Sequence, residues 1–127
     1  MDIEDMVKKA VQAKINAYAP YSGFRVGASL LTSDGEVFTG CNVENISYGA
    51  TCCAERVAIF KAISEEKRQF KAMAIASDLE DFIYPCGICR QVIVEFGVPI
   101  VIVSNSKGEY IKYNSRDLLP FAFDRID

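Results

Sequence analysis

Two short cysteine clusters hold the residues of this chain that are best suited to chemistry. The first is Thr51-Cys52-Cys53-Ala54-Glu55-Arg56 and the second is Pro85-Cys86-Gly87-Ile88-Cys89-Arg90, each at the start of a predicted helix. Residues three apart share a helix face, so Cys86 and Cys89 can both reach one Zn²⁺, and Cys53 can supply a third thiolate. The chain contains no histidine, so a metal must rely on thiolate or carboxylate ligands.

Glu55 beside three thiolates indicates catalytic zinc. Catalytic zinc keeps three protein ligands and an open position for water, whose pKa it lowers, whereas structural zinc closes all four positions. Glu55 and Cys53 are two residues apart and do not share a helix face, so the ion must lie off the helix end. We therefore predict that Glu55 stays unligated and moves protons.

The three-thiolate site needs positive compensation, because its ligands outweigh the charge of Zn²⁺. The two helix N-termini offer partial positive charge, and Arg56 and Arg90 follow the clusters directly. We hypothesise that Arg56 bonds a ligand thiolate.

Other interpretations of the cysteines stay open at this point. A Cys-x-x-Cys pair at a helix start also fits a thioredoxin-like redox site. Cys52 could join the three thiolates in a structural Cys₄ site of a non-catalytic binding module. Alternatively, Cys41 and Cys52 are small buried apolar residues.

The elements that must position these residues follow from periodicity and turn signals. The pattern predicts helices, strands and turns in an order that places the later strands after helical crossovers. We expect an α/β fold of three layers, with a mixed five-stranded sheet between helices. The predicted ranges are helix 3–18, a hairpin of strands 24–31 and 36–43, helix 52–64, strand 72–76, a helix with Pro85 in its first turn that stops at Gly97 and Pro99, strands 100–103 and 110–113, and an apolar tail over 117–123.

Composition bounds the remaining possibilities. A length of 127 residues predicts a single domain, 1–127. A net charge of -3 does not indicate the positive surface that binding to nucleic acid or to an anionic membrane requires. Half of the residues are apolar, and a chain of this size has much surface relative to its volume, so we expect partner subunits to cover part of the apolar surface. The acidic opening lacks the pattern of a secretory signal, and five cysteines suit metal binding, so we expect a reducing cytoplasm.

These motifs resemble the small homotetrameric branch of the zinc-dependent cytidine deaminases, which acts on free nucleosides. Zinc deaminases of bases carry a ligand-x-Glu element and a later Pro-Cys-x-x-Cys element. Cys53 stands where many relatives have histidine, as in the three-cysteine branch, and Ile88 stands where a smaller residue is usual. The resemblance covers nearly the whole chain and includes Pro20-Tyr21-Ser22-Gly23-Phe24, Gly40-Cys41-Asn42-Val43-Glu44-Asn45 and Leu118-Leu119-Pro120.

The resemblance also implies substrate-binding roles. Asn42 and Glu44 would bind the ribose hydroxyls, and alternate residues of a strand do project to one face. Phe24 would pack on the pyrimidine, while Phe123 and Tyr48 would reach a neighbouring subunit's site.

The implied reaction is hydrolytic deamination of cytidine and deoxycytidine to uridine and deoxyuridine in pyrimidine salvage, with one Zn²⁺ per subunit. The N–H of Ala54 would bond the base carbonyl, and Glu55 the ring nitrogen. A deaminase of a cytosine-containing antibiotic is the nearest enzyme alternative, and a non-catalytic zinc module is the alternative outside enzymes.

Overall fold

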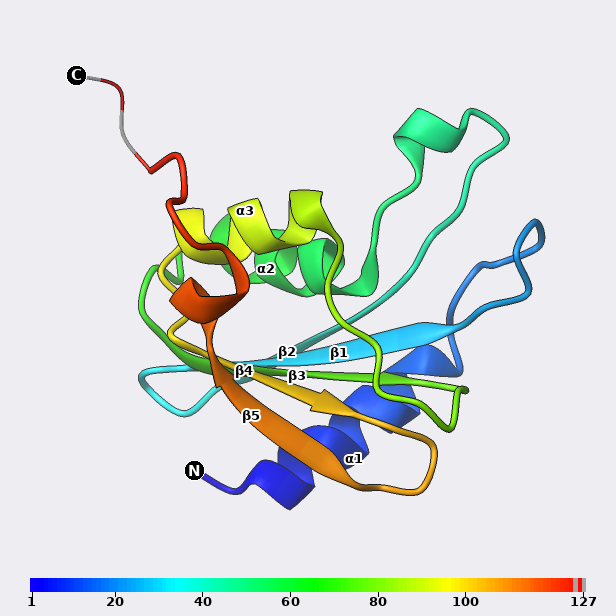
Figure 1. Ribbon diagram of the computed structural model, residues 1–127, viewed down its shortest axis with the longest axis horizontal. Helices are drawn as coiled ribbons and strands as arrows, with labels where there is room; N and C mark the ends of the chain where they lie inside the picture. The colour runs from blue at the N-terminus through cyan, green and yellow to red at the C-terminus, as the bar shows by residue number, and fades with distance from the viewer. Residues whose placement is uncertain (125, 127) are drawn as a thin grey trace.

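The computed structural model describes residues 1–124 and 126, and it contains a five-stranded sheet between two layers of helices (Figure 1). The strand order is β2-β1-β3-β4-β5. Strands β3 and β4 are parallel and the other neighbours antiparallel, so the predicted mixed sheet and α/β class are confirmed. The elements are α1 (Ile3–Lys14), β1 (Val26–Thr32), β2 (Val37–Cys41), the 3₁₀ turn η1 (Tyr48–Ala50), α2 (Ala54–Ser64), β3 (Phe70–Ser77), α3 (Gly87–Glu95), β4 (Ile100–Ser104), β5 (Tyr110–Asn114) and the 3₁₀ turn η2 (Ser115–Leu118).

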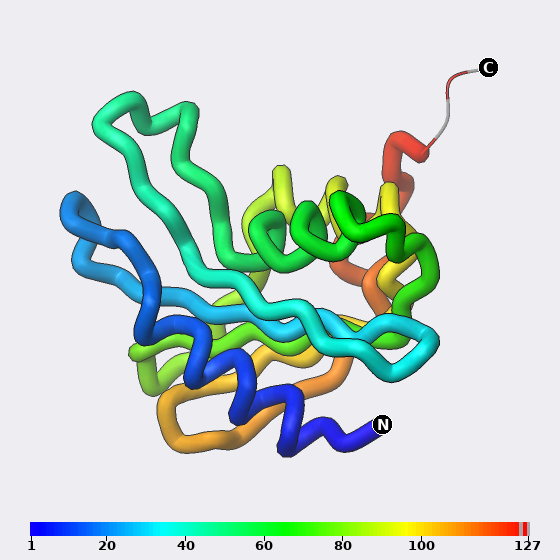
Figure 2. The backbone as a smooth tube through the Cα atoms, turned by 180° about the vertical axis from the view of Figure 1, so that it is seen from behind, coloured from blue at the N-terminus to red at the C-terminus, as the bar shows by residue number. Residues whose placement is uncertain are grey.

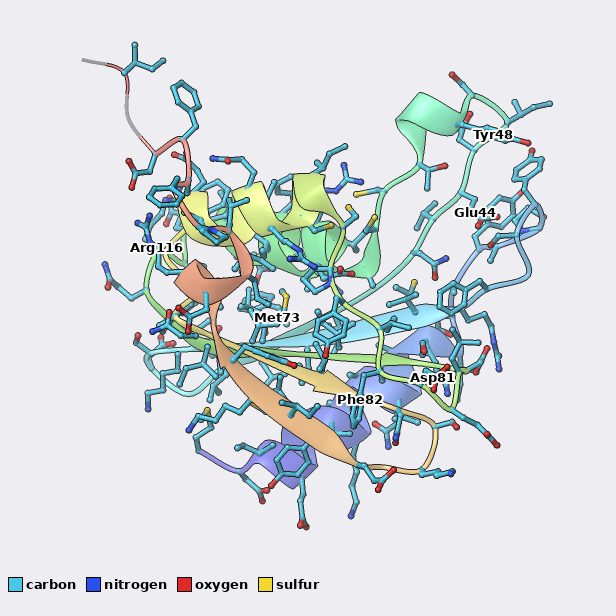
Figure 3. All side chains as sticks on the ribbon, in the orientation of Figure 1. Glu44, Tyr48, Met73, Asp81, Phe82 and Arg116 are labelled. Carbon is cyan, nitrogen blue, oxygen red and sulfur yellow. The ribbon has the colours of Figure 1, made fainter. Side chains whose placement is uncertain are left out.

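Strand β3 is buried on both faces, and its side chains alternate between the two helix layers. Ala72, Ala74 and Ala76 belong to the cluster of buried residues that includes Met6 and Val7 of α1. Their small side chains let α1 lie close to the sheet. The residues between them, Met73 and Ile75, belong to the larger cluster formed with α2 and α3, and Figure 3 shows Met73 between the sheet and these helices. The period of two along a strand explains both contacts.

Gly40 allows α2 to lie directly on β2. A Cβ atom at this position would stand 2.4 Å from the Ala54 carbonyl oxygen and 2.6 Å from the Ala58 nitrogen. Both atoms belong to the backbone of α2, so any side chain at Gly40 would force the helix away. The first turn of α2 is therefore placed against the sheet by this glycine.

Two loops, residues 15–25 and 42–52, extend beyond the same end of strands β1 and β2 (Figures 1 and 2). Tyr18 forms a parallel bridge with Val43, and the rings of Tyr21 and Tyr48 meet edge to face with centroids 6.2 Å apart. Glu44 and Tyr48 both lie on the second loop (Figure 3). The two loops are thus joined to each other along their length.

The first and third helices are shorter than predicted. Helix α1 ends at Lys14 rather than near Tyr18, because the Tyr18 N–H donates to the Asn42 carbonyl at 3.0 Å and so joins the second loop. Helix α3 begins at Gly87, and Pro85 lies before it instead of in its first turn, because Cys86 takes the N-cap position. The tail contains the turn η2, and beyond it Phe121 and Phe123 are exposed.

The helices of the described residues are too short or too polar to cross a membrane.

Candidate metal centre and active site

Three thiols from two helix starts meet at one point. The Sγ atoms of Cys53, Cys86 and Cys89 all lie within 4.8 Å of one another, and those of Cys53 and Cys86 are 3.9 Å apart. Two sulfurs bound to the same tetrahedral zinc at about 2.3 Å stand about 3.8 Å apart. The predicted ligands are therefore placed to hold one metal ion, and soft thiolates in this number suit zinc.

Two of these cysteines are helix N-caps. Cys53 caps α2 and Cys86 caps α3, each with an extended backbone at ψ 156° and ψ 170°. The Cys89 N–H also points to the Cys86 Sγ at 3.5 Å. Helix N-termini carry partial positive charge and free N–H groups. Both helices consequently favour the thiolate form that zinc requires.

Arg56 adds a full positive charge beside the thiols. Its Nη2 donates to the Cys53 Sγ at 3.4 Å and to the Thr51 carbonyl at 3.3 Å. The Cys89 thiol and the Arg56 guanidinium together lower the pKa of Cys53 to about 5. Sharing its proton with Cys53 and being buried raise the pKa of Cys89. Cys53 is thus a thiolate at neutral pH.

Glu55 is a buried carboxylate with an unused oxygen. Its side chain is 4% exposed, and its Oε1 has no hydrogen-bond partner among the described residues. Burial raises its pKa to about 7, and the nearby Cys53 charge adds to this shift. A buried acceptor without a partner is costly in a folded protein. Near neutrality such a group can both accept and release a proton.

A cavity of about 450 Å³ is lined by Glu55 and by two of the three clustered cysteines, Cys53 and Cys86. Ala54 also lies on its wall, and the Ala54 N–H, in the first helical turn, has no acceptor within its own helix. The size is that of a site for a small molecule. The full lining is Ser22, Phe24, Val26, Asn42, Glu44, Thr51, Cys53, Ala54, Glu55, Ile83, Tyr84 and Cys86.

Asn42 and Glu44 hold the segment that carries Phe24. The Asn42 side chain accepts from the Val26 N–H at 2.9 Å and donates to the Phe24 carbonyl at 2.8 Å. Glu44 accepts from the Tyr21 and Ser22 N–H groups and from the Ser22 hydroxyl. The Ser22 hydroxyl and these N–H groups lower the pKa of Glu44, so it is ionised at neutral pH.

The protein-family model that describes the cytidine and deoxycytidylate deaminase zinc-binding region matches residues 1–105 of this chain. The chain belongs to this family. The resemblance to the cytidine deaminases that was inferred from the motifs is confirmed. The chain is a zinc-dependent enzyme of this family.

Relatives of this family match over almost the full chain. A cytidine deaminase of Sporosarcina psychrophila is 47% identical, over 100% of this chain and 95% of the relative. A probable cytidine deaminase of Dictyostelium discoideum is 48% identical over 99% of this chain and 86% of its own. The crystal structure of cytidine deaminase from Burkholderia pseudomallei superposes with a TM-score of 0.93 at 46% identity, covering 97% of this chain and all of that one.

Tyr48 and Phe123, the two residues predicted to reach a neighbouring subunit's site, lie outside the main cavity. Tyr48 borders an adjoining cavity of about 380 Å³ that shares Ser22, Glu44 and Thr51 with the first. Phe123 lies in the C-terminal tail, 68% exposed, and its carbonyl accepts from the Gln91 side chain at 2.6 Å.

The other two cysteines are not part of the metal cluster. Among the residues that the structure describes, the group placed for a metal holds only the three predicted thiols and neither Cys41 nor Cys52. Both are free thiols that are half-buried, so they are less buried than the interpretation as small buried apolar residues expects. A Cys₄ site is therefore not formed.

Sequence reasoning missed two cavity residues near the metal end. Ile83 and Tyr84 line the cavity, yet neither was assigned a role. Their place directly before Pro85 and Cys86 was the available signal, because residues that flank a ligand are carried to the site with it.

Proposed function

We propose that this chain catalyses the hydrolytic deamination of free cytidine and deoxycytidine, giving uridine or deoxyuridine and ammonia, as a step of pyrimidine salvage. The observation that carries the proposal is the unbonded Oε1 of Glu55, which lines the same cavity as Cys53 and Cys86, two of the three clustered thiols. Relatives named cytidine deaminase that align over nearly the whole chain support it.

The three thiolates of Cys53, Cys86 and Cys89 hold the metal, and Glu55 handles the protons. When bound, Zn²⁺ supplies the Lewis acidity that activates a water molecule for attack on the carbon bearing the amine. Glu55 accepts the proton released by the attacking water and delivers it to the ring nitrogen. It then takes the proton of the new hydroxyl group on the carbon and passes it to the departing amine, which leaves as ammonia while the carbonyl forms. Its pKa of about 7 suits a group that must both take and give protons near neutrality.

The charges around the cavity favour a free nucleoside over a nucleotide or a polynucleotide. The described lining of the two adjoining cavities includes Glu44 and Glu55 but neither lysine nor arginine. The nearby Arg25 is paired with Asp78 through two hydrogen bonds, of 2.9 and 3.2 Å. A phosphate would need a cationic partner in this place.

The sugar and the base each have candidate partners in the cavity. Glu44 is ionised and can accept from ribose hydroxyls, and Asn42 keeps one N–H of its amide beyond the bond to Phe24. Phe24 offers a ring for the pyrimidine, and the Ala54 N–H would donate to the base carbonyl. These assignments extend the family resemblance residue by residue.

We also propose a homotetramer in which Tyr48 and Phe123 reach the site of a neighbouring copy. Exposed apolar side chains on the 42–52 loop and the C-terminal tail support this: Ile46, Tyr48, Phe121 and Phe123 are 80%, 76%, 104% and 68% exposed. Light scattering tests it, since a fully active monomer would refute both the assembly and the role of Phe123.

The setting proposed for the enzyme is the reducing cytoplasm, with residues 1–127 as a single domain. The reducing setting is supported by the five cysteines, which are all free thiols, as a thiolate metal site requires of its ligands. The single domain is supported by the two buried clusters, which pack on opposite faces of the same sheet.

The deciding experiment follows the ultraviolet absorbance of cytidine and deoxycytidine with the zinc-loaded protein, beside Glu55→Gln and the exposed control Glu80→Gln. Wild type and Glu80→Gln should convert both nucleosides. Glu55→Gln should lose conversion by at least about 100-fold while it keeps its zinc. No conversion of either nucleoside by wild type with one zinc bound would refute the proposal and direct attention to modified cytosines.

A further inference from the structure

Tyr84 lines the cavity together with the metal ligands Cys53 and Cys86. The metal chemistry assigns it no role. Tyr84 lies on the loop between β3 and α3 (residues 78–86), two positions before Cys86, and lines the same cavity as Cys53, Glu55 and Cys86. Pro85 between Tyr84 and Cys86 is fully buried and fixes its own φ, so little freedom separates the two residues. Tyr84 therefore shares a cavity with the proton carrier Glu55 and two of the metal ligands.

The Tyr84 ring is anchored to the sheet through Tyr113. Their hydroxyl oxygens are 2.7 Å apart, and the rings meet edge to face with centroids 5.6 Å apart and an interplanar angle of 63°. Tyr113 belongs to β5, where it is paired with Val101 of β4, and packs against the main core cluster. The contact joins two segments that are 29 residues apart in the chain.

The anchoring contact favours a protonated Tyr113. The Tyr84 hydroxyl raises the pKa of Tyr113 above its ordinary value, so the Tyr113 hydroxyl keeps its proton at neutral pH. One hydroxyl donates to the other, and Tyr84 stays 43% exposed in the lining of the cavity. The neighbouring residues of the loop support this position, because Phe82 and Ile83 pack against the main core cluster, and Figure 3 shows Phe82 on the loop near the sheet.

We propose that Tyr84 is a specificity-determining residue, which packs its ring against the pyrimidine and restricts substituents on the ring carbon beside the one that loses the amine. Tyr113 is its positioning residue. The inference rests on the proposed function, since it takes the pyrimidine nucleoside as the occupant of the cavity. Aromatic packing on a base is worth about 1–3 kcal/mol, which corresponds to about 5- to 150-fold in affinity.

The test compares Tyr84→Ala, Tyr84→Phe, Tyr113→Phe and the double variant Tyr84→Phe/Tyr113→Phe. Tyr110→Phe is the matched control, because Tyr110 lies on the same strand β5 but does not line the cavity. For each protein, kcat and KM are measured with cytidine and with 5-methylcytidine. Binding of uridine by calorimetry gives a readout that does not depend on turnover, and zinc content and Tm report folding.

Tyr84→Ala should raise KM for cytidine and Kd for uridine by about tenfold, with kcat and zinc content little changed. It should also improve kcat/KM for 5-methylcytidine relative to cytidine. Tyr84→Phe and Tyr113→Phe should each raise KM by about two- to threefold, and the double variant should show no further rise, because all three lose the same contact. Tyr110→Phe should behave as wild type.

An unchanged uridine Kd and an unchanged preference between the two nucleosides in Tyr84→Ala would overturn the inference and leave the proposed function intact. Additive effects of the two phenylalanine variants would overturn the role of Tyr113. If wild type converts neither nucleoside, the proposed function fails by itself. The uridine Kd then decides the inference alone, which stands if the Kd depends on Tyr84 and falls if it does not.

Discussion

Arg56 donates a hydrogen bond to the sulfur of Cys53 at 3.4 Å and holds the Thr51 carbonyl with the same nitrogen. One guanidinium thus compensates the charge of a metal ligand and fixes the chain segment that leads into it. Its buried Nε has no hydrogen-bond partner among the described residues. Three thiolates on a divalent ion give a net negative centre, so the loss of this cation has a defined effect.

Arg56→Gln should weaken zinc binding by about 10- to 100-fold, because groups that bond a metal ligand contribute this much to affinity. It should also lower kcat, since a more negative centre makes a water molecule at the metal harder to ionise. Zinc affinity is measured by competition with a chelator, and kcat is measured at saturating zinc. The control is Arg116→Gln, whose guanidinium pairs with Asp124 at the surface. Equal zinc affinity in both variants would contradict the assignment.

The metal ligands could be predicted from the sequence because their signals are local. Cys86 and Cys89 are three apart at a helix start, and the same context recurs at Cys53, so the spacing places them without any knowledge of the fold. The mixed sheet and the three layers followed from periodicity and from the rule for crossover connections.

What the sequence could not predict depends on contacts between distant segments. The end of α1 is set by the bond between Tyr18 and Asn42, which a helical pattern does not contain. The contact between Tyr84 and Tyr113 joins a loop to the edge strand. The position of Tyr84 before Pro85 and Cys86 is a local signal for the cavity, but no local pattern pairs it with Tyr113, so this contact became visible only in three dimensions.

Zinc should depend on Cys86 and not on Cys52. Cys86→Ser should lose zinc and activity, because it removes one of three converging thiols. Cys52→Ser should keep one zinc per chain and most of the activity, since Cys52 is outside the metal group and burial raises the pKa of its thiol. Metal analysis after dialysis distinguishes the two variants. Loss of zinc from Cys52→Ser would instead support a four-thiolate site.

The hairpin loop between β1 and β2 should add stability only above mildly acidic pH. The Thr32 hydroxyl and Lys67, at 2.9 Å, lower the pKa of Asp34 to about 2. A lowered folded pKa stabilises the fold above the unfolded value of about 3.9, and the gain disappears as the pH falls towards 2. Asp34→Asn keeps a suitable turn residue before Gly35, at φ 91°, but cannot ionise.

Urea unfolding of wild type and Asp34→Asn between pH 7 and pH 3 measures this contribution. The difference in unfolding free energy should be constant from pH 7 to about pH 5 and shrink below about pH 4. It should also be smaller at high salt, because Asp34 is exposed. A difference that grows as the pH falls would have the wrong sign for a lowered pKa.

Gly40→Ala should damage both stability and activity through the backbone of α2. The added Cβ would meet the Ala54 oxygen at 2.4 Å and the Ala58 nitrogen at 2.6 Å, and neither backbone atom can turn away as a side chain could. The helix must shift, and overpacking of this kind costs about 1–3 kcal/mol. Since Cys53 and Glu55 belong to the first turn of this helix and its cap, the shift also displaces a ligand and the proton carrier.

Gly49→Ala is the matched control for this substitution, because a Cβ at Gly49 meets nothing within 4 Å. Thermal unfolding should show a clear loss of Tm for Gly40→Ala and almost none for Gly49→Ala. A displacement of about 1 Å can cost about 100-fold in rate, so kcat of Gly40→Ala should fall well beyond the loss of folded protein. A stable, fully active Gly40→Ala protein would mean that α2 can move on β2 without moving the site, and that the close approach at Gly40 does not position Cys53 and Glu55.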